Sequence, residues 1–313
     1  MDKRDLLAEI QELRRKRNAV ILAHNYQIPE IQDLADFCGD SLGLCREAQK
    51  TDNPVIVFCG VNFMAETASV LCPERTILIP DRAAGCSLAA SVTAEQVRQW
   101  KAQFQDPLVV AYVNTSADVK AESDYCCTSG NAVQIVEALP PDREVLFLPD
   151  VFLGAHVERV TGRKMHLWMG ECHVHAGIDA DSINALAAEH PDAELLIHPE
   201  CGCTTPIQYL ASEGKILAPV KVVSTEGMVK EALSSTRSEF IVATEIGILH
   251  RMSQLAPDKT FIPANPEASC SFMKRITVEK LRDALKYLQF EVKVPAATAA
   301  RARLPIERMT AIG

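Results

Sequence analysis

The sequence predicts an α/β protein built from three small αβα sandwich units with parallel sheets, arranged around a common centre. Runs rich in β-branched residues alternate with helical patterns along the whole chain, which is typical of parallel sheets with helical crossovers. The same order of runs is written three times within 313 residues. The runs end in polar residues, and parallel sheets bind ligands at the carboxyl ends of their strands.

The first run of each copy follows a helical segment and reads VILAHNY, LVVAYVN or ELLIHPE. The spacing is regular, since His24 lies 88 residues before Tyr112 and Tyr112 lies 86 before His198. In an extended strand, residues two apart face the same side. Each run should therefore present one pair of side chains to a ligand: His24 with Tyr26, Tyr112 with Asn114, and His198 with Glu200. The alternative is that each pair only terminates its strand.

A stretch with hydroxyl side chains follows in each copy, just ahead of a helical pattern. The stretches GDSL, CTSGN and VVSTEGM contain Ser41, Ser129, Ser224 and Thr225. These residue types are typical N-caps of helices. A hydroxyl beside the free N–H groups of a helix start is also a natural site for a carboxylate or a phosphate. We expect capping at these positions, and anion binding is compatible with it.

The last run of each copy leads to a cysteine. In each copy, a third β-rich run reads VIVFCG, VLFLPD or FIVATE. A fourth run ends at Cys86, Cys172 or Cys270 and reads RTILIPDRAAGC, KMHLWMGEC or KTFIPANPEASC. A threefold arrangement of the units would bring these cysteines together. Three thiolates supply one ligand too few for a 4Fe–4S cubane, so one iron would stay open to substrate as a Lewis acid.

Two other interpretations of the cysteines stay open. Free cysteine is often an inert core residue. Zinc is the competing metal, because Cys172, His173 and His175 lie together and Cys201 and Cys203 add two donors. Structural zinc sites usually separate paired cysteines by two residues, and no such pair occurs in this chain.

The composition limits the class of protein. A net charge of −9 and a pI near 5.4 argue against nucleic acid as a partner. No segment approaches the roughly 20 apolar residues of a membrane span, and the N-terminus reads as an amphipathic helix, so we expect a cytoplasmic protein. Its 11 cysteines should then not form a disulfide framework. Glycine-rich nucleotide fingerprints are missing.

We expect three units along the chain. Their ranges are 1–91, 92–177 and 178–313, and the third range includes a C-terminal segment that we expect to pack on the first unit.

The motifs resemble those of quinolinate synthase in collinear order from His24 to Lys274. They are HNYQIPE, GDSL, PDRAAGC, YVNTSADVKAESDYCCTSGNA, GECHVH, HPEC, VVSTEGM and ATEIGILH. The resemblance implies condensation of iminoaspartate with dihydroxyacetone phosphate, with loss of phosphate and water, to give quinolinate for NAD biosynthesis. It also implies functional coupling to an L-aspartate oxidase.

The resemblance also implies roles for residues at matching positions. Cys86, Cys172 and Cys270 would hold one 4Fe–4S cluster with one open iron. Substrate binding and acid–base steps would fall to the strand-end residues His24, Tyr26, Tyr112, Asn114, His198 and Glu200, of which Glu200, His198, Tyr26 and Tyr112 are the candidate catalytic groups. The hydroxyl residues Ser41, Ser129, Ser224 and Thr225 would bind carboxylate or phosphate.

The sequence departs from the family in one respect and leaves other classes open. Some members have a cysteine-rich motif around the third ligand, whereas Cys270 stands alone here, so no disulfide switch is expected there. The resemblance assigns no role to Glu226. One alternative is a reductive dehydroxylase of an isoprenoid diphosphate, which lacks the HNYQIPE signature. The other is a non-enzymatic iron–sulfur sensor, which predicts a DNA-binding or partner-binding element, and the sequence shows no basic helix-turn-helix pattern.

Overall fold

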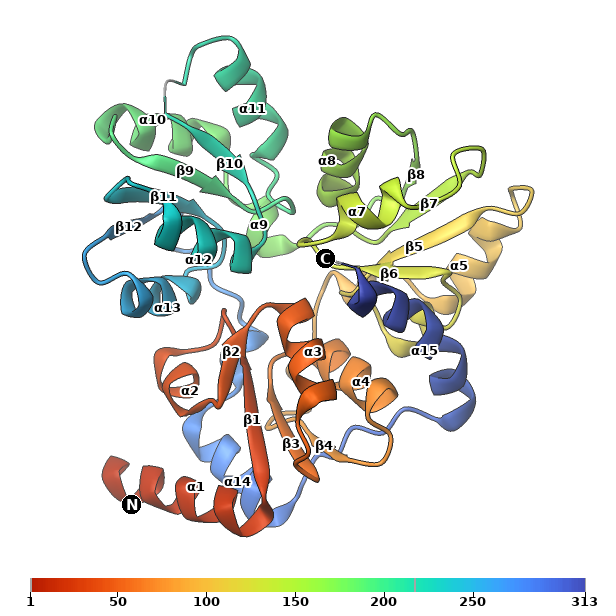
Figure 1. Cartoon of the computed structure of the whole chain (residues 1–313), viewed down its shortest axis with the longest axis vertical. Coiled ribbons are helices and arrows are strands. Elements are labelled where there is room, and N and C mark those ends of the chain that lie inside the picture. The colour runs from red at the N-terminus through yellow and green to blue at the C-terminus, as the bar shows by residue number, and fades with distance from the viewer. Residues whose placement is uncertain (1, 217, 313) are drawn as a thin grey trace.

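The computed structural model describes residues 2–216 and 218–312. It consists of three lobes around a common centre, each with one parallel four-stranded sheet and helices on its faces (Figure 1). The three sheets share one strand order, namely β2-β1-β3-β4, β6-β5-β7-β8 and β10-β9-β11-β12. The predicted α/β class and its three-unit architecture are confirmed.

The first lobe begins with a helix, as predicted. Its strands are β1 (Ala19–His24), β2 (Phe37–Gly39), β3 (Val55–Cys59) and β4 (Thr76–Leu78). Its helices are α1 (Lys3–Arg17), α2 (Pro29–Leu34), α3 (Ser41–Lys50), α4 (Asn62–Leu71) and the short 3-10 helix η1 (Ala89–Ser91). β1 and β3 are buried along their whole length, which explains why they read as continuous apolar runs.

The second lobe repeats this pattern. Its strands are β5 (Leu108–Tyr112), β6 (Tyr125–Cys127), β7 (Val145–Leu148) and β8 (His166–Leu167). Its helices are α5 (Ala94–Lys101), α6 (Ala117–Lys120), α7 (Ala132–Glu137), α8 (Val151–Thr161) and α9 (His173–Ala176). Helix α5 starts at a capping box, because Thr93 accepts the Gln96 backbone N–H and the Gln96 side chain returns to the Thr93 N–H.

The third lobe has its own core on one face of its sheet. Its strands are β9 (Glu194–Ile197), β10 (Val220–Val222), β11 (Glu239–Ala243) and β12 (Thr260–Pro263). Its helices are α10 (Ala180–Glu189), α11 (Thr204–Ser212), α12 (Thr225–Ser234), α13 (Ile248–Leu255) and η2 (Met273–Arg275). Along β9, Leu195 and Ile197 join this core, while Leu196 faces the core shared with the other lobes.

Two helices follow the third sheet. α14 (Val278–Tyr287) packs along α1 in the first lobe. α15 (Ala296–Ala311) lies against α4, α6 and β6, and so bridges the first and second lobes (Figure 1). Within the described residues, no helix is both long and apolar enough to cross a membrane.

The short edge strands β2, β6 and β10 were not predicted. Each contains only three residues, FCG, YCC or VKV, which are too few to show a β pattern, and each ends where a hydroxyl-containing stretch begins. These strands bring the hydroxyl residues to the same edge of each sheet as the other strand ends.

Candidate functional site

A cavity of about 70 Å³ lies where the three lobes meet. The carboxyl ends of the strands converge there, as expected for parallel sheets. Every predicted site residue except Ser224 lines this cavity: His24, Tyr26, Ser41, Cys86, Tyr112, Asn114, Ser129, Cys172, His198, Glu200, Thr225 and Cys270. The structure thus brings the predicted residues together, while their individual roles stay predictions.

The three repeated cysteines reach the cavity from the ends of the three sheets. Cys86, Cys172 and Cys270 are partly exposed and line it, and none of the other cysteines in the described part of the chain does. Burial, together with the neighbouring Cys172 thiol, raises the pKa of Cys86 to about 12. Backbone N–H groups point at two of the three sulfurs: Ala89 N–H lies 3.5 Å from Cys86 Sγ, and the Phe272 and Met273 N–H groups face Cys270. Such a set of soft, N–H-bonded thiols suits iron–sulfur ligation.

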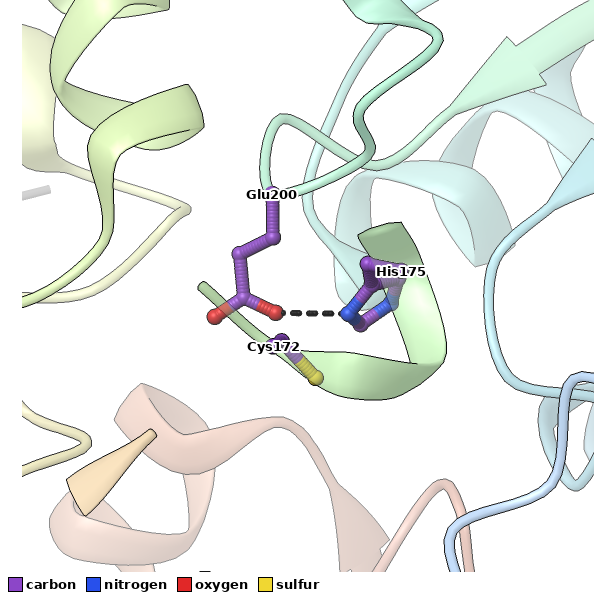
Figure 2. A group of neighbouring side chains, drawn as sticks. All are labelled: Cys172, His175 and Glu200. Carbon is purple, nitrogen blue, oxygen red and sulfur yellow. Dashed lines mark ion pairs between the residues drawn. The ribbon is translucent and has the colours of Figure 1, made fainter. Parts of the chain in front are cut away.

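Glu200 and His175 form a buried pair beside Cys172 (Figure 2). His175 Nδ1 lies 2.9 Å from Glu200 Oε2, and the two side chains are 2% and 3% exposed. One donor atom of each residue and Cys172 Sγ all lie within 4.8 Å of one another, so the three can also hold a metal ion. Burial opposes charge on both partners. The neighbouring Cys172 thiol, followed by Glu200, raises the pKa of His175 well above its usual range, and His175 lowers the pKa of Glu200.

Neighbouring polar groups orient this pair. His198 Nδ1 lies 3.5 Å from Glu200 Oε2, and Asn114 Nδ2 donates to Glu200 Oε1 at 3.3 Å. The Tyr112 hydroxyl also hydrogen-bonds to the carboxylate. The His175 and His198 rings stack with centroids 4.7 Å apart. Glu200 is therefore the polar centre of the cavity wall.

Tyr26 reaches the same pair from the first lobe. Its Oη lies 2.5 Å from Thr244 Oγ1 and 3.4 Å from His175 Nε2. The Thr244 hydroxyl also contacts His175 Nε2 at 2.9 Å. Burial lowers the pKa of His24 and of His198 to about 3, so both imidazoles are neutral at pH 7. A neutral imidazole offers both a donor and an acceptor to a substrate.

Two buried carboxyl groups lie near the cysteines and were missed as functional residues. Glu245, at the end of the third run of its copy, accepts the Cys270 backbone N–H at 3.1 Å and pairs with Lys274 Nζ at 2.9 Å. Asp150, in the matching place of the second lobe, accepts the Leu153 backbone N–H at 2.7 Å through Oδ1, and its Oδ2 is buried without a hydrogen-bond partner. Burial and Glu200 raise the pKa of Asp150 well above its usual range. An acidic residue ends the third run in both of these copies, and this recurrence could have pointed to Asp150 and Glu245 from the sequence.

The predicted N-caps are only partly right. Ser224 caps α12 by accepting the Gly227 N–H at 3.3 Å, which turns it away from the cavity lining. Ser41 is instead the first residue of α3, whose cap is Asp40. Ser129 lies in a turn ahead of α7. Asp40 accepts the Gly43 N–H at the start of α3, Asn131 accepts the Thr128 N–H within the turn before α7, and both serine hydroxyls are left at the cavity.

The sequence predicted no disulfide framework, and one pair among the described cysteines is bridged. Cys201 and Cys203 form a disulfide, because the turn after β9 brings their Cα atoms to 5.2 Å, within the usual range for a bridge. Their sulfurs are then not free to bind zinc. His173 Nδ1 contacts Ser87 Oγ at 2.8 Å.

The fold and the site define a three-lobed α/β protein with three thiols and a buried carboxylate–imidazole pair at one cavity. The family model described as "Quinolinate synthetase A protein" matches residues 8–311. The chain belongs to this family.

Curated relatives agree with the family assignment. Proteins named quinolinate synthase from a Thermus thermophilus strain and from Mycobacterium sp. strain KMS are 57% and 56% identical over 98% of this chain, covering 97% and 91% of their own lengths. The enzyme of the same name from a Mycobacterium tuberculosis strain is 53% identical over 98% of this chain and 88% of its own.

A solved structure of an E-1-hydroxy-2-methyl-but-2-enyl-4-diphosphate reductase from Plasmodium falciparum was also matched. It is 9% identical to this chain, and the match covers 91% of this chain and 94% of the chain in the solved structure. Its TM-score of 0.36 is too low to support any argument.

Proposed function

We propose that this chain is a quinolinate synthase that condenses iminoaspartate with dihydroxyacetone phosphate, releasing phosphate and water, for NAD biosynthesis. We propose that it does so with one 4Fe–4S cluster held by Cys86, Cys172 and Cys270. The observation that carries the proposal is the meeting of one thiol from each lobe at a cavity that also contains the Glu200–His175 pair. The family membership supports the same activity.

The donor chemistry fits the proposed cofactor. Three thiols and backbone N–H groups directed at sulfur suit an iron–sulfur cluster better than oxygen-loving cations. When bound, the cluster supplies a Lewis acid for dehydration at its one iron without a protein ligand. Cys172 is assigned to the cluster, which leaves Glu200 and His175 free for proton transfer.

The residues around the cavity have distinct proposed roles. The Glu200 carboxylate takes a substrate proton as general base, and the charge on His175 stabilises the carboxylate before the transfer. Tyr112 and Asn114 fix the carboxylate by hydrogen bonds. Tyr26, whose hydroxyl contacts Thr244, holds the opposite side of the His175 ring.

Anionic groups of the substrates would bind at the hydroxyl side of the cavity. Ser41, Ser129 and Thr225 line it, one from each lobe. Thr225 Oγ1 accepts a hydrogen bond from Asn25 Nδ2 at 3.0 Å, so its own proton can be donated to an anion. Ser41 lies at the start of α3, where free N–H groups favour negative charge.

The proposed activity carries two expectations about the cell. A cytoplasmic location would keep the three thiols reduced for metal binding. Functional coupling to an L-aspartate oxidase is expected because an imine hydrolyses in water and must be used soon after it forms.

Quinolinate formation by the purified protein tests the proposal. The protein would be loaded with iron and sulfide under anaerobic conditions, supplied with both substrates, and assayed for quinolinate by chromatography. We expect product that depends on both substrates and on the loaded iron. No product from fully loaded protein would overturn the proposed activity.

A further inference from the structure

The end of the chain crosses two lobes beside the cavity. We call residues 309–312, at the end of α15 and just after it, the C-terminal strap. Asn131, from the second lobe, donates through Nδ2 to the carbonyl oxygens of Met309 at 2.9 Å and Ile312 at 2.8 Å. The strap is therefore attached to the second lobe by one amide group.

The first lobe holds the same segment. Arg46 donates to the Thr310 carbonyl through Nε at 3.1 Å and Nη2 at 3.0 Å, and Nη2 also reaches the Ile312 carbonyl at 3.2 Å. Arg46 belongs to α3, whose first residue, Ser41, lines the cavity. The C-terminal strap thus connects α3 with the second lobe, and in Figure 1 the end of α15 lies near the centre of the molecule.

The acceptor side of Asn131 shapes the cavity wall. Its Oδ1 accepts the Thr128 backbone N–H at 2.8 Å and the Thr128 hydroxyl at 3.1 Å. Asn131 is 0% exposed, and its amide uses both donors and both acceptor positions. Thr128 and Ser129 line the cavity. A single buried amide therefore joins the strap to a wall that carries a candidate anion-binding hydroxyl.

The turn lies close to both other lobes. A Cβ at Gly130 would lie 3.3 Å from Ser224 Oγ in the third lobe and 3.7 Å from Asp40 Oδ2 in the first. The turn thus lies where the three lobes meet, and a shift of the turn changes its distance to the other two lobes. Releasing its attachment to the strap should displace Ser129 relative to Ser41 and Thr225 across the cavity.

We propose that Asn131 is a positioning residue, which uses the C-terminal strap to fix the turn at residues 128–131 so that Ser129 meets an anionic group of the substrate. The identity of this ligand rests on the proposed function. The strap acts on binding of the anion, whereas Glu200 acts on the chemical step. Loss of the strap should therefore raise KM more than it lowers kcat.

Asn131→Asp tests this proposal. The substitution keeps an oxygen toward Thr128 but replaces the donor with an oxygen that faces two carbonyl oxygens. We expect carboxypeptidase to release the last residues at least about tenfold faster, and quinolinate to bind the holoenzyme about tenfold more weakly, the size of one or two lost hydrogen bonds. Calorimetry with quinolinate, digestion followed by mass spectrometry, and a KM-against-kcat comparison measure these effects.

Asn53→Asp is the matched control, because Asn53 Nδ2 also bridges two oxygens, the Asn18 carbonyl and side-chain oxygens at 3.0 Å each, on an exposed part of the first lobe. It should change none of the three readouts. A chain ending at Thr310 gives a second variant that leaves Asn131 intact and loses one of its two acceptors. It should show a smaller change of the same kind.

The results separate the two proposals. Faster digestion with unchanged quinolinate affinity would overturn the positioning role, and unchanged digestion of Asn131→Asp would overturn the strap. If the wild-type holoenzyme makes no quinolinate, the proposed function fails. In that case, the affinity of the same variants for inorganic phosphate still tests the positioning role of Asn131 and the strap.

Discussion

Replacing Glu200 by glutamine removes the charge at the centre of the cavity and keeps the shape of the side chain. The carboxylate is 3% exposed and lies 2.9 Å from His175, and it accepts from Asn114 and Tyr112. An amide oxygen can still accept from Asn114 and Tyr112, and without its negative partner the buried His175 should lose its proton, so that no unpaired charge stays buried. We therefore expect the fold and the iron content to be retained.

The catalytic effect should be large. A general base contributes at least about 100-fold to the rate, so kcat/KM for quinolinate formation should fall by about 2.7 kcal/mol of transition-state stabilisation or more. The assay compares kcat/KM of the variant and the wild type at equal iron loading.

Glu194→Gln provides a matched control. Glu194 is also 3% exposed and lies at the other end of β9, where it binds Lys221 at 3.1 Å and Ser235 Oγ at 2.8 Å. This variant should keep normal kcat/KM. If Glu200→Gln retains activity within about tenfold of the wild type, or if Glu194→Gln loses as much, the assignment of Glu200 as the base is wrong.

Three further predictions concern other parts of the molecule. Ser41→Ala and Ser129→Ala should weaken inhibition by a dicarboxylate about tenfold at less than about 1 kcal/mol cost in stability, since neither residue caps a helix; unchanged inhibition would remove them from the anion site. Burial lowers the pKa of the fully buried Lys120, so the folded state binds its proton less tightly than the unfolded state, and stability should rise with pH toward the usual Lys value of 10.5. The free energy of unfolding, measured by urea titration, should therefore rise less between about pH 8 and 10 in Lys120→Met than in the wild type. The same pH dependence in both proteins would contradict this prediction. Unfolded, metal-free protein should show nine thiols before reduction, because Cys201 and Cys203 are paired; all 11 reacting at once would disprove the bridge.

The repeat made much of the fold and the site predictable. Each lobe builds its sheet from apolar runs that end in polar residues, so strand ends such as Tyr26 and Glu200 could be placed at a ligand site from the sequence. The recurrence of Cys86, Cys172 and Cys270 after the last strand likewise predicted their meeting at one cavity.

Other features depend on contacts that no local pattern reports. The pairing of His175 with Glu200 joins a helix start to a strand end 25 residues later. Glu245 looks like an ordinary strand end until its carboxyl group is seen to accept the Cys270 N–H. Asn131 resembles a turn residue, and its bond to the strap spans 181 residues.

Iron and sulfide content after anaerobic loading tests the central claim most directly, namely that one cysteine from each lobe holds the cluster. The wild type should bind about four irons and four sulfides per chain, and Cys126→Ser, at a buried position away from the cavity, should bind as many. Serine at Cys86, Cys172 or Cys270 should each time abolish most of the bound iron and the visible absorption. A full cluster in any of these three variants, or zinc in place of iron in the wild type, would contradict the account.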